Sequence, residues 1–291
     1  MKVLIIGSTG MLGQALIKEA TYRGIESIGS SRTGSQTTIE ITNDIDIQEK
    51  IEYVRPDVII NTAAITNLSL CEKKPDYAYL VNGRAVSIIA KQAEKLGAYF
   101  IQISTDHYYT GDKNLLHNES SPISLLNEYA RTKYVGELFA LTYQNSLVVR
   151  TNIVGFRDRP DQPTFVEEII KKFQDEREHL TLFDDFYTSS IDVAHFSTAL
   201  FDLIPKKITG TINLASKEVS TKKQFISALA EQLGFSLTNR TSIGSVTSLC
   251  NVVRAESLGL EVSKTEKVLG RSLPNLTQVV ESLASEYRRR Y

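Results

Sequence analysis

Near its amino terminus this chain reads Val3-Leu4-Ile5-Ile6-Gly7-Ser8-Thr9-Gly10-Met11-Leu12-Gly13, and this stretch decides its fold. The short apolar run at its start predicts a buried parallel strand, and the apolar residues after Gly13 continue as a helix. A strand, a glycine turn and a helix in this order are the context of the dinucleotide-binding fingerprint. Gly7 allows the tight turn, Gly10 lets a pyrophosphate approach the backbone, and Gly13 lets the helix pack closely. The alternative is a plain glycine-rich turn.

Strands and helices alternate through the first half of the chain. Predicted strands cover residues 25–29, 57–61, 99–104 and 146–150, and predicted helices lie around 47–54, 75–96 and Tyr129. Such alternation predicts an α/β fold, a Rossmann-type doubly wound parallel sheet. Ligands of such sheets bind at the carboxyl ends of strands. Polar residues follow those ends at Asn61-Thr62, Ser104-Thr105 and Arg150-Thr151-Asn152.

After Asn152 the alternation breaks down. Helices are predicted at 165–173, 222–233 and 276–288, with one short strand at 210–214. We therefore predict an NADP-binding Rossmann domain over 1–155, rejoined by about 188–220. Residues 156–291 mainly form a smaller, mixed α/β substrate-binding domain.

Tyr129 and Lys133 lie four residues apart, so a helix presents the phenol and the ammonium on one face. The ammonium favours the phenolate and lowers the tyrosine pKa from its reference of about 10. Such a tyrosine can exchange a proton with a substrate oxygen. A solvated pair on a helix surface is the commoner reason for this spacing, so the interpretation depends on the motifs around it.

Composition excludes several classes of protein. The 291 residues carry a net charge of -1, with 42% hydrophobic and 23% charged residues, which gives no field to attract nucleic acid or an anionic membrane. Cys71 and Cys250 form no disulfide framework, and the four histidines are scattered, so no metal site is predicted. The chain enters its first strand at once and has no long apolar run, which favours a cytoplasmic protein.

Taken in order, the motifs resemble those of the extended short-chain dehydrogenase/reductase superfamily, and within it the dTDP-4-dehydrorhamnose reductase family and its sugar-nucleotide relatives. The resemblance covers essentially the whole chain. It rests on the glycine motif, Asn61-Thr62-Ala63-Ala64, Val81-Asn82, Ser104-Thr105-Asp106, Tyr129-x-x-x-Lys133 and Val149-Arg150-Thr151.

The resemblance implies a catalytic set of Thr105, Tyr129 and Lys133. Thr105 hydrogen-bonds the C4 carbonyl oxygen of a keto-sugar, Tyr129 protonates that oxygen, and Lys133 binds the nicotinamide ribose. The implied activity is NADP(H)-dependent reduction of a nucleotide-activated 6-deoxysugar, as in dTDP-L-rhamnose and polysaccharide biosynthesis. Related dehydratases carry Thr-Asp-Glu where this chain has Thr105-Asp106-His107, so reduction is favoured over dehydration.

For the cofactor, NADP(H) is favoured over NAD(H). The second strand ends in Gly29-Ser30-Ser31-Arg32, without the carboxylate that NAD-binding proteins place on the ribose hydroxyls. Ser31 and Arg32 could hold a 2′-phosphate instead. The predicted cofactor-binding residues are Gly7, Thr9, Gly10, Met11, Leu12, Gly13, Ser31, Arg32, Glu40, Ile41, Thr62, Ala63, Ala64, Thr66, Asn82, Ser104, Tyr129 and Lys133.

The predicted substrate-binding residues are Thr105, Asp106, His107, Tyr108, Asn152 and Arg254. The chain departs from the family pattern after Thr105, at Asn152 and at 188–194, which leaves the exact sugar and nucleotide open. Two other hypotheses remain: a sugar-nucleotide epimerase or other reductase, and a non-catalytic NADP-binding subunit resembling the beta subunit of methionine adenosyltransferase. A homodimer is also left open.

Overall fold

The computed structural model describes residues 1–249 and 252–290, and the chain divides into two compact units. Unit 1 contains Met1–Thr105, Leu125–Arg150 and Ser197–Ile212. Unit 2 contains Asp106–Ser124, Thr151–Phe196 and the chain from Asn213 onward. Residues 106–124 and 151–155, which the sequence groups with the first domain, therefore cluster with unit 2.

Unit 1 is built on a seven-stranded sheet in the order β11-β6-β5-β4-β1-β2-β3. Its strands are β1 (Lys2–Ile6), β2 (Glu26–Ser31), β3 (Thr37–Thr38), β4 (Val58–Asn61), β5 (Tyr99–Ile103), β6 (Ser146–Arg150) and β11 (Gly210–Asn213). The pairs from β6 to β3 are parallel. The strand order reverses between β1 and β4, the switch point at which such sheets bind ligands. The predicted Rossmann-type fold is confirmed.

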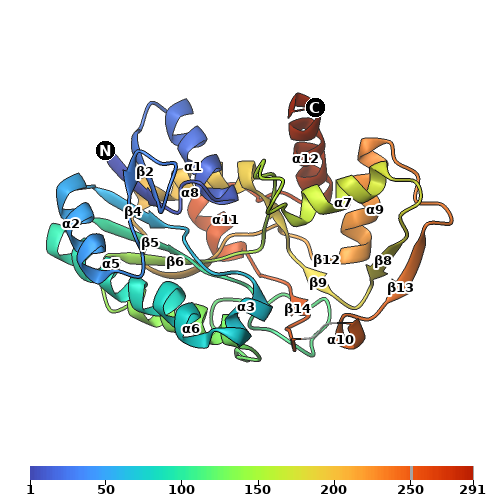
Figure 1. The fold of residues 1–291 in the computed structure, drawn as a ribbon, viewed down its shortest axis with the longest axis horizontal. Helices are drawn as coiled ribbons and strands as arrows, with labels where there is room; N and C mark the ends of the chain where they lie inside the picture. Colours follow the sequence, from blue (N-terminus) through green and yellow to red (C-terminus); the bar gives the residue numbers. More distant parts are fainter. Residues whose placement is uncertain (250–251, 291) are drawn as a thin grey trace. The chain divides into compact units, whose positions relative to one another are not determined.

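Helices cover both faces of this sheet, as Figure 1 shows, with α1 and α8 above the strands and α5 and α6 below. Buried residues of α2 and α5 pack on β1, β4 and β5 in one apolar cluster, because their helices place aliphatic side chains on a single face. The helices are α1 (Met11–Tyr22), α2 (Asp44–Val54), α3 (Leu68–Lys73), α4 (Pro75–Tyr79), α5 (Ala85–Leu96), α6 (Glu128–Ala140) and α8 (Val193–Leu203).

The helix predicted over 75–96 is interrupted. Between α4 and α5, Leu80–Arg84 forms a π-helical segment. The predicted end is correct, since Gly97 adopts φ 67° and caps α5. The π segment contains Asn82, whose contacts are described below.

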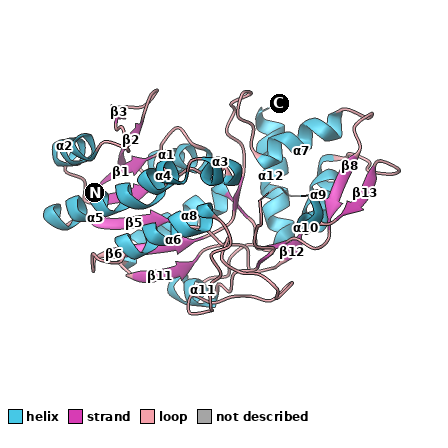
Figure 2. Cartoon of the chain, turned by 60° about the horizontal axis from the view of Figure 1, so that its bottom comes forward, coloured by secondary structure: helices cyan, strands magenta, loops and turns pink. Residues whose placement is uncertain are grey.

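Unit 2 is the predicted mixed α/β part. Three helices, α7 (Phe165–Gln174), α9 (Lys222–Leu233) and α12 (Leu276–Arg290), surround an apolar core that includes Phe173, Phe225 and Leu283. Figure 2 shows β8 and β13 as a separate pair beside them. The remaining elements are β7 (Ile153–Val154), β8 (Leu180–Phe183), β9 (Tyr187–Thr188), β10 (Ile191–Asp192), β12 (Ser220–Thr221), β13 (Thr241–Gly244), α10 (Val246–Leu249), β14 (Ser257–Leu258) and α11 (Ser263–Leu269).

Candidate active site

The glycine turn joins β1 to α1 at the switch point of the sheet. Gly7 has φ 88°, and a Cβ on Gly13 would lie 2.2 Å from the Gly7 carbonyl oxygen, so both positions require glycine. Gly10 stands at the amino end of α1 and offers no side chain to cap it. The first N–H groups of this helix, at Met11, Leu12 and Gly13, precede its hydrogen-bond ladder, and the helix dipole is positive there. The turn therefore fits the pyrophosphate of a dinucleotide.

The end of β2 has no carboxylate. Ser31 donates its hydroxyl to the Thr33 carbonyl oxygen at 2.6 Å, and Arg32 beside it is exposed. A hydrogen bond from Thr42 holds the pKa of Glu40 below its usual range, and the charge of Arg32 adds to this effect. The charge of Arg32 thus acts on Glu40, and the cofactor contacts of both residues stay predictions. Ile41, the next residue, is buried.

The segment after β4 is held in place by two side chains. Thr62 donates its hydroxyl to the carbonyl oxygen of Ile6 at 2.8 Å. Asn82 pairs with both backbone groups of Ile65, accepting from the N–H at 2.8 Å and donating to the carbonyl at 3.0 Å, and it also donates to Thr132. This side chain is buried and fully engaged by protein groups. Asn82 therefore orders the 62–66 segment, and a direct cofactor contact by Asn82 stays a prediction.

The predicted catalytic residues all belong to unit 1. Asn127 caps α6 by accepting from the Ala130 N–H at 2.9 Å, which starts the helix just before Tyr129. Lys133, one turn further on, donates from Nζ to the carbonyl oxygen of Ile103 at 2.7 Å. This bond ties α6 to the carboxyl end of β5, two residues before Thr105. Thr105, Tyr129 and Lys133 are each at least nine-tenths buried.

Burial lowers the pKa of Lys133 to about 8, and the charge of Glu137 opposes that shift. Glu137 follows Lys133 by one helical turn and is itself buried. It accepts hydrogen bonds from Ser104 at 2.6 Å and from Arg150 at 2.8 Å. No sequence pattern pointed to Glu137, because a glutamate at this spacing is usually on a solvated helix surface.

In unit 2, Asp106 and Asn152 contact each other. The Asn152 amide donates to Asp106 Oδ2 at 2.7 Å, and the amide oxygen accepts from the Ser190 hydroxyl at 2.8 Å. Asp106 has almost no exposed surface. The two predicted substrate residues from the ends of β5 and β6 therefore form one polar cluster.

Three basic side chains gather beside Asp106. Burial, together with the charges of Arg254 and Lys222, lowers the pKa of His107 to about 4. Burial also lowers the pKa of Lys222 to about 8, against the attraction of Asp106. Lys222 Nζ lies 4.4 Å from the centre of the Phe165 ring.

Within the described residues, the Lys222 ammonium contacts aromatic rings but forms no hydrogen bond, and one nitrogen of Arg254 is also without one. Arg254 Nε is buried without a hydrogen bond, and the Lys222 ammonium has neither a hydrogen bond nor an ion pair within residues 1–249 and 252–290. A partly buried cation without a hydrogen-bonding or ionic partner is stabilised by an anion, so such a cluster suits an anionic ligand. The sequence analysis found Arg254 but missed Lys222, because a lysine at a helix start usually reaches water.

Tyr108 packs in the interior, whereas Asp106 and His107 belong to the polar cluster described above. It is fully buried and packs edge-on against Tyr109, with ring centres 6.4 Å apart. Tyr109 in turn stacks on His117 at 4.1 Å. Tyr108 is thus a buried residue packed against Tyr109, and its predicted role in substrate choice stays a prediction.

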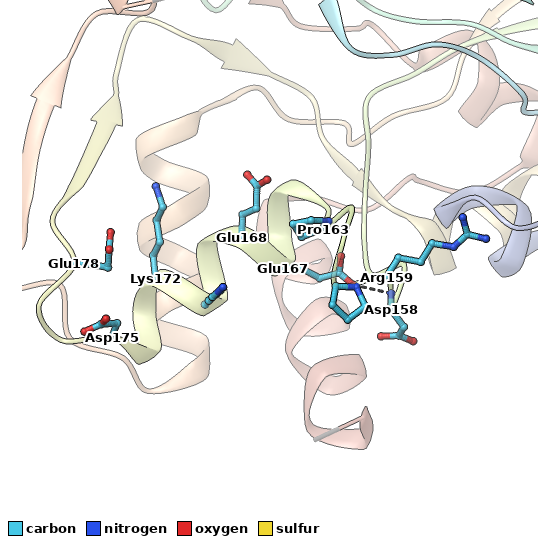
Figure 3. Close-up of a pocket in the computed structure, with 10 residues that line it drawn as sticks. Asp158, Arg159, Pro163, Glu167, Glu168, Lys172, Asp175 and Glu178 are labelled. Carbon is cyan, nitrogen blue, oxygen red and sulfur yellow. Dashed lines mark hydrogen bonds between the residues drawn. The ribbon is translucent and has the colours of Figure 1, made fainter. Parts of the chain in front are cut away.

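A cavity of about 760 Å³ in unit 2 is lined by none of the predicted site residues. Figure 3 shows it over α7 and the loop before it, where Glu167 accepts from the Asp158 N–H at 2.8 Å. Charged residues of both signs line it: Asp158, Arg159, Glu167, Glu168, Lys171, Lys172, Asp175 and Glu178. This cavity belongs to the charged surface of α7.

Residues 1–249 and 252–290 contain no group of three or more His, Cys, Asp or Glu side chains arranged to hold a metal ion. No helix in that part of the chain is long and apolar enough to cross a bilayer. Cys71 is buried and has a free thiol, and Cys250 lies outside the described residues.

The Rossmann sheet, the glycine turn and the Tyr129–Lys133 helix define an extended short-chain dehydrogenase/reductase, an NAD(P)H-dependent oxidoreductase. The chain belongs to the RmlD substrate binding domain family, whose model matches residues 1–289.

Two curated relatives illustrate the range of this similarity. The spore coat polysaccharide biosynthesis protein SpsK of Bacillus subtilis is 28% identical over 250 residues, which is 85% of this chain and 83% of the relative. The methionine adenosyltransferase 2 subunit beta of Mus musculus is 28% identical over 294 residues, covering 97% of this chain and 87% of the relative.

Solved structures share the whole fold. The dTDP-4-dehydrorhamnose reductase of Bacillus anthracis in complex with NADP superposes with a TM-score of 0.88 at 24% identity, covering 98% of this chain and 99% of that one. The Bordetella bronchiseptica enzyme WbmG in complex with NAD and UDP superposes with a TM-score of 0.82 at 20% identity. The superposition covers 99% of this chain and 95% of that one. Nicotinamide cofactors of both kinds therefore occur on this fold.

Proposed function

We propose that this protein reduces the C4 keto group of a nucleotide-activated 6-deoxysugar with NADPH, in the cytoplasm, as in dTDP-L-rhamnose biosynthesis. The observation that carries the proposal is the bond from Lys133 Nζ to the Ile103 carbonyl at 2.7 Å. This bond fixes the Lys133 ammonium at the end of β5. Tyr129 precedes Lys133 by one turn of α6, and Thr105 follows Ile103 by two residues. The names of the relatives, a polysaccharide biosynthesis protein and a dTDP-4-dehydrorhamnose reductase, support the same activity.

In the proposed mechanism each residue acts on the carbonyl oxygen or on the cofactor. Thr105 donates a hydrogen bond to the C4 carbonyl oxygen, and Tyr129 transfers its phenolic proton to that oxygen as negative charge develops there. NADPH, when bound, would supply the hydride that C4 accepts. Hydride and proton together convert the carbonyl to an alcohol. Lys133 remains protonated, binds the nicotinamide ribose and stabilises the Tyr129 phenolate that remains.

NADP(H) is the cofactor we favour. Gly7, Gly10 and Gly13 would hold the pyrophosphate at the start of α1. Arg32 is an exposed guanidinium after a strand without a carboxylate, and guanidinium groups bind phosphate in two-point contacts. Unit 1 would therefore be the cofactor-binding part of the chain.

We assign the nucleotide-sugar to residues of unit 2. Asp106 and Asn152 would contact the sugar, and Arg254 would bind the diphosphate with Lys222 beside it. The Lys222 ammonium and Arg254 Nε, which form no hydrogen bond within the described residues, support this assignment. His107 follows Asp106 where dehydratases carry a glutamate, which favours reduction over elimination. A homodimer remains a prediction.

A regulatory subunit is the second candidate function. Its support is the mouse methionine adenosyltransferase 2 subunit beta, which aligns over 97% of this chain. A subunit that only binds NADP would not need Thr105, Tyr129 and Lys133 together, and this chain has all three. An epimerase with the same catalytic set is a third candidate.

The test is an NADPH oxidation assay with a panel of nucleotide 4-keto-sugars. Turnover of one member with release of the 4-hydroxy sugar supports the proposal and identifies the substrate. Sugar conversion without net NADPH consumption would show an epimerase. Tight NADPH binding with no turnover across the panel would favour the regulatory subunit.

A further inference from the structure

A buried polar network joins α6 to the ends of β5 and β6. The Glu137 carboxylate is only 1% exposed, and Arg150 donates to it from Nε at 3.0 Å and from the terminal nitrogen at 2.8 Å. The Ser104 hydroxyl donates to the same carboxylate at 2.6 Å. Three donors of this kind occupy the carboxylate oxygens and fix the Glu137 side chain in place.

This fixed anion is one helical turn from the buried lysine of the proposed active site. Side chains four residues apart on a helix are neighbours, about 5–6 Å apart at Cβ. Glu137 is the charged group that acts on the Lys133 ammonium, Tyr129 precedes Lys133 by one turn on the same helix, and Arg150 on β6 is paired with Glu137. The charge of Glu137 is the one that stabilises the protonated amine, whereas burial favours its neutral form.

We propose that Glu137 is a positioning residue that keeps the Lys133 ammonium charged and directed to the end of β5, and that Ser104 and Arg150 fix its carboxylate for this task. The inference rests on the proposed function, because it assigns Lys133 a catalytic charge. A lysine that loses its proton also loses its attraction for the Tyr129 phenolate, so the charge of Glu137 would set the upper pH limit of the reaction.

This role reassigns two side chains. The Ser104 hydroxyl donates to Glu137, and its predicted cofactor contact stays a prediction. Arg150 was predicted to lie at a strand end and belongs to the Val149-Arg150-Thr151 motif. Both would act on the reaction through Glu137, which itself acts through Lys133.

The direct test measures the titration of Lys133 in Glu137→Gln, an isostere that keeps the shape and removes the charge. The full-length protein carries ¹³C-labelled lysine, and the Lys133 signal is assigned by its loss in Lys133→Arg. We expect the Lys133 pKa to fall by about 1 unit or more, the usual scale for losing a nearby opposite charge. Glu19→Gln is the matched control, because it removes a carboxylate from another arginine pair of unit 1, with Arg23 on α1.

A second readout is the pH profile of kcat/KM with the identified sugar. Its alkaline limb should move to lower pH in Glu137→Gln and stay in place in Glu19→Gln. Since Glu137→Gln leaves a buried arginine unpaired, Glu137→Gln/Arg150→Met serves if the single variant does not fold. A Lys133 titration that matches wild type in the folded variant would overturn the proposal. The Lys133 titration is measured without substrate turnover. A failure of this proposal can therefore be distinguished from a failure of the proposed function.

Discussion

Lys133 and Lys222 both have a pKa that burial lowers to about 8, yet their surroundings differ. Lys133 donates to a backbone carbonyl and has a carboxylate one turn away. Lys222 lies over Phe165, and the partners of its ammonium within the described chain are aromatic rings. The first lysine is held by the protein in its charged form, and the second is available to an anion.

The most direct residue-level prediction concerns Tyr129. Replacing Tyr129 with Phe keeps the ring and removes the proton donor, so reductase turnover should fall by about 10²-fold or more. NADPH affinity should stay near wild type when measured by fluorescence titration. Turnover by the Phe variant close to wild type would remove Tyr129 from the mechanism.

Arg32 should discriminate between the cofactors. Arg32→Ala removes a charge-assisted contact to the 2′-phosphate, worth about 1.5–3 kcal/mol, and NADH lacks this phosphate. Titration calorimetry should therefore show weaker NADPH binding and nearly unchanged NADH binding. Arg55→Ala, at another exposed arginine of unit 1, is the control. Equal losses for both cofactors would show that Arg32 does not contact the phosphate.

The cationic cluster of unit 2 gives a pH-dependent prediction. Lys222 is protonated below its pKa of about 8, so the KM for the nucleotide-sugar should rise as the pH increases through that value. The groups around Lys222 are Asp106, His107 and Arg254. Lys222→Arg stays charged across this range and should abolish the rise.

Arg254→Ala tests the same cluster without titration. Loss of one charge-assisted contact should raise the KM for the sugar nucleotide by roughly 10-fold or more and leave the KM for NADPH unchanged. Steady-state kinetics at pH 7 measures both. Sugar-nucleotide kinetics identical to wild type would place the diphosphate elsewhere.

At the scale of the element, the π segment Leu80–Arg84 shows where sequence patterns stop being informative. Apolar periodicity predicted one helix over 75–96, and α5 and its Gly97 cap agree with it. A π segment inserts one residue into the helical repeat and has no composition of its own. Its position depends on Asn82 meeting Ile65 and Thr132, which are distant in the sequence.

Asn82→Ala should therefore destabilise the fold. The variant leaves both backbone groups of Ile65 without their partner, at a cost of about 1–3 kcal/mol. Urea unfolding should show a lower midpoint with an unchanged slope. Asn145→Ala, which loses only a 3.4 Å contact to Tyr143, should stay within about 0.5 kcal/mol of wild type. Equal stability of the two variants would contradict the bridging role of Asn82.

Contacts between residues distant in the chain leave no local pattern, and this explains which site residues could be predicted from the sequence. The glycine turn and Tyr129-x-x-x-Lys133 are local patterns, so their elements could be predicted. Glu137 and Lys222 matter through neighbours far away in the chain, Arg150 and Asp106, and local sequence carries no sign of these contacts. The two-residue strands of unit 2 were missed because they are too short for an alternating pattern.

At the scale of the whole molecule, the chain passes from one unit to the other several times. It leaves unit 1 after Thr105 and after Arg150, at the carboxyl ends of β5 and β6, and returns at Leu125 and Ser197. The last return supplies Ser197–Ile212, which carries most of α8 and nearly all of β11 beside β6. Unit 1 is thus incomplete until residue 212 has been made.

A fragment of residues 1–155 should consequently fail to melt cooperatively. It lacks the buried Leu200, Phe201 and Ile212, so one face and one edge of the sheet would be exposed. Circular dichroism on heating checks this expectation. A matched fragment that adds residues 197–212 through a flexible linker should regain a transition, whereas a sharp transition in 1–155 alone would contradict it.

Three stretches of sequence build each unit, and this has a consequence for the gene. No single stop codon separates one complete unit from the other, because the segments of both are interleaved along the message. Exchanging unit 2 between relatives would require five coordinated crossovers, one at each boundary between the segments of the two units. Recombination that swaps substrate preference in this family should therefore be sought within short loops, rather than at one boundary between two halves.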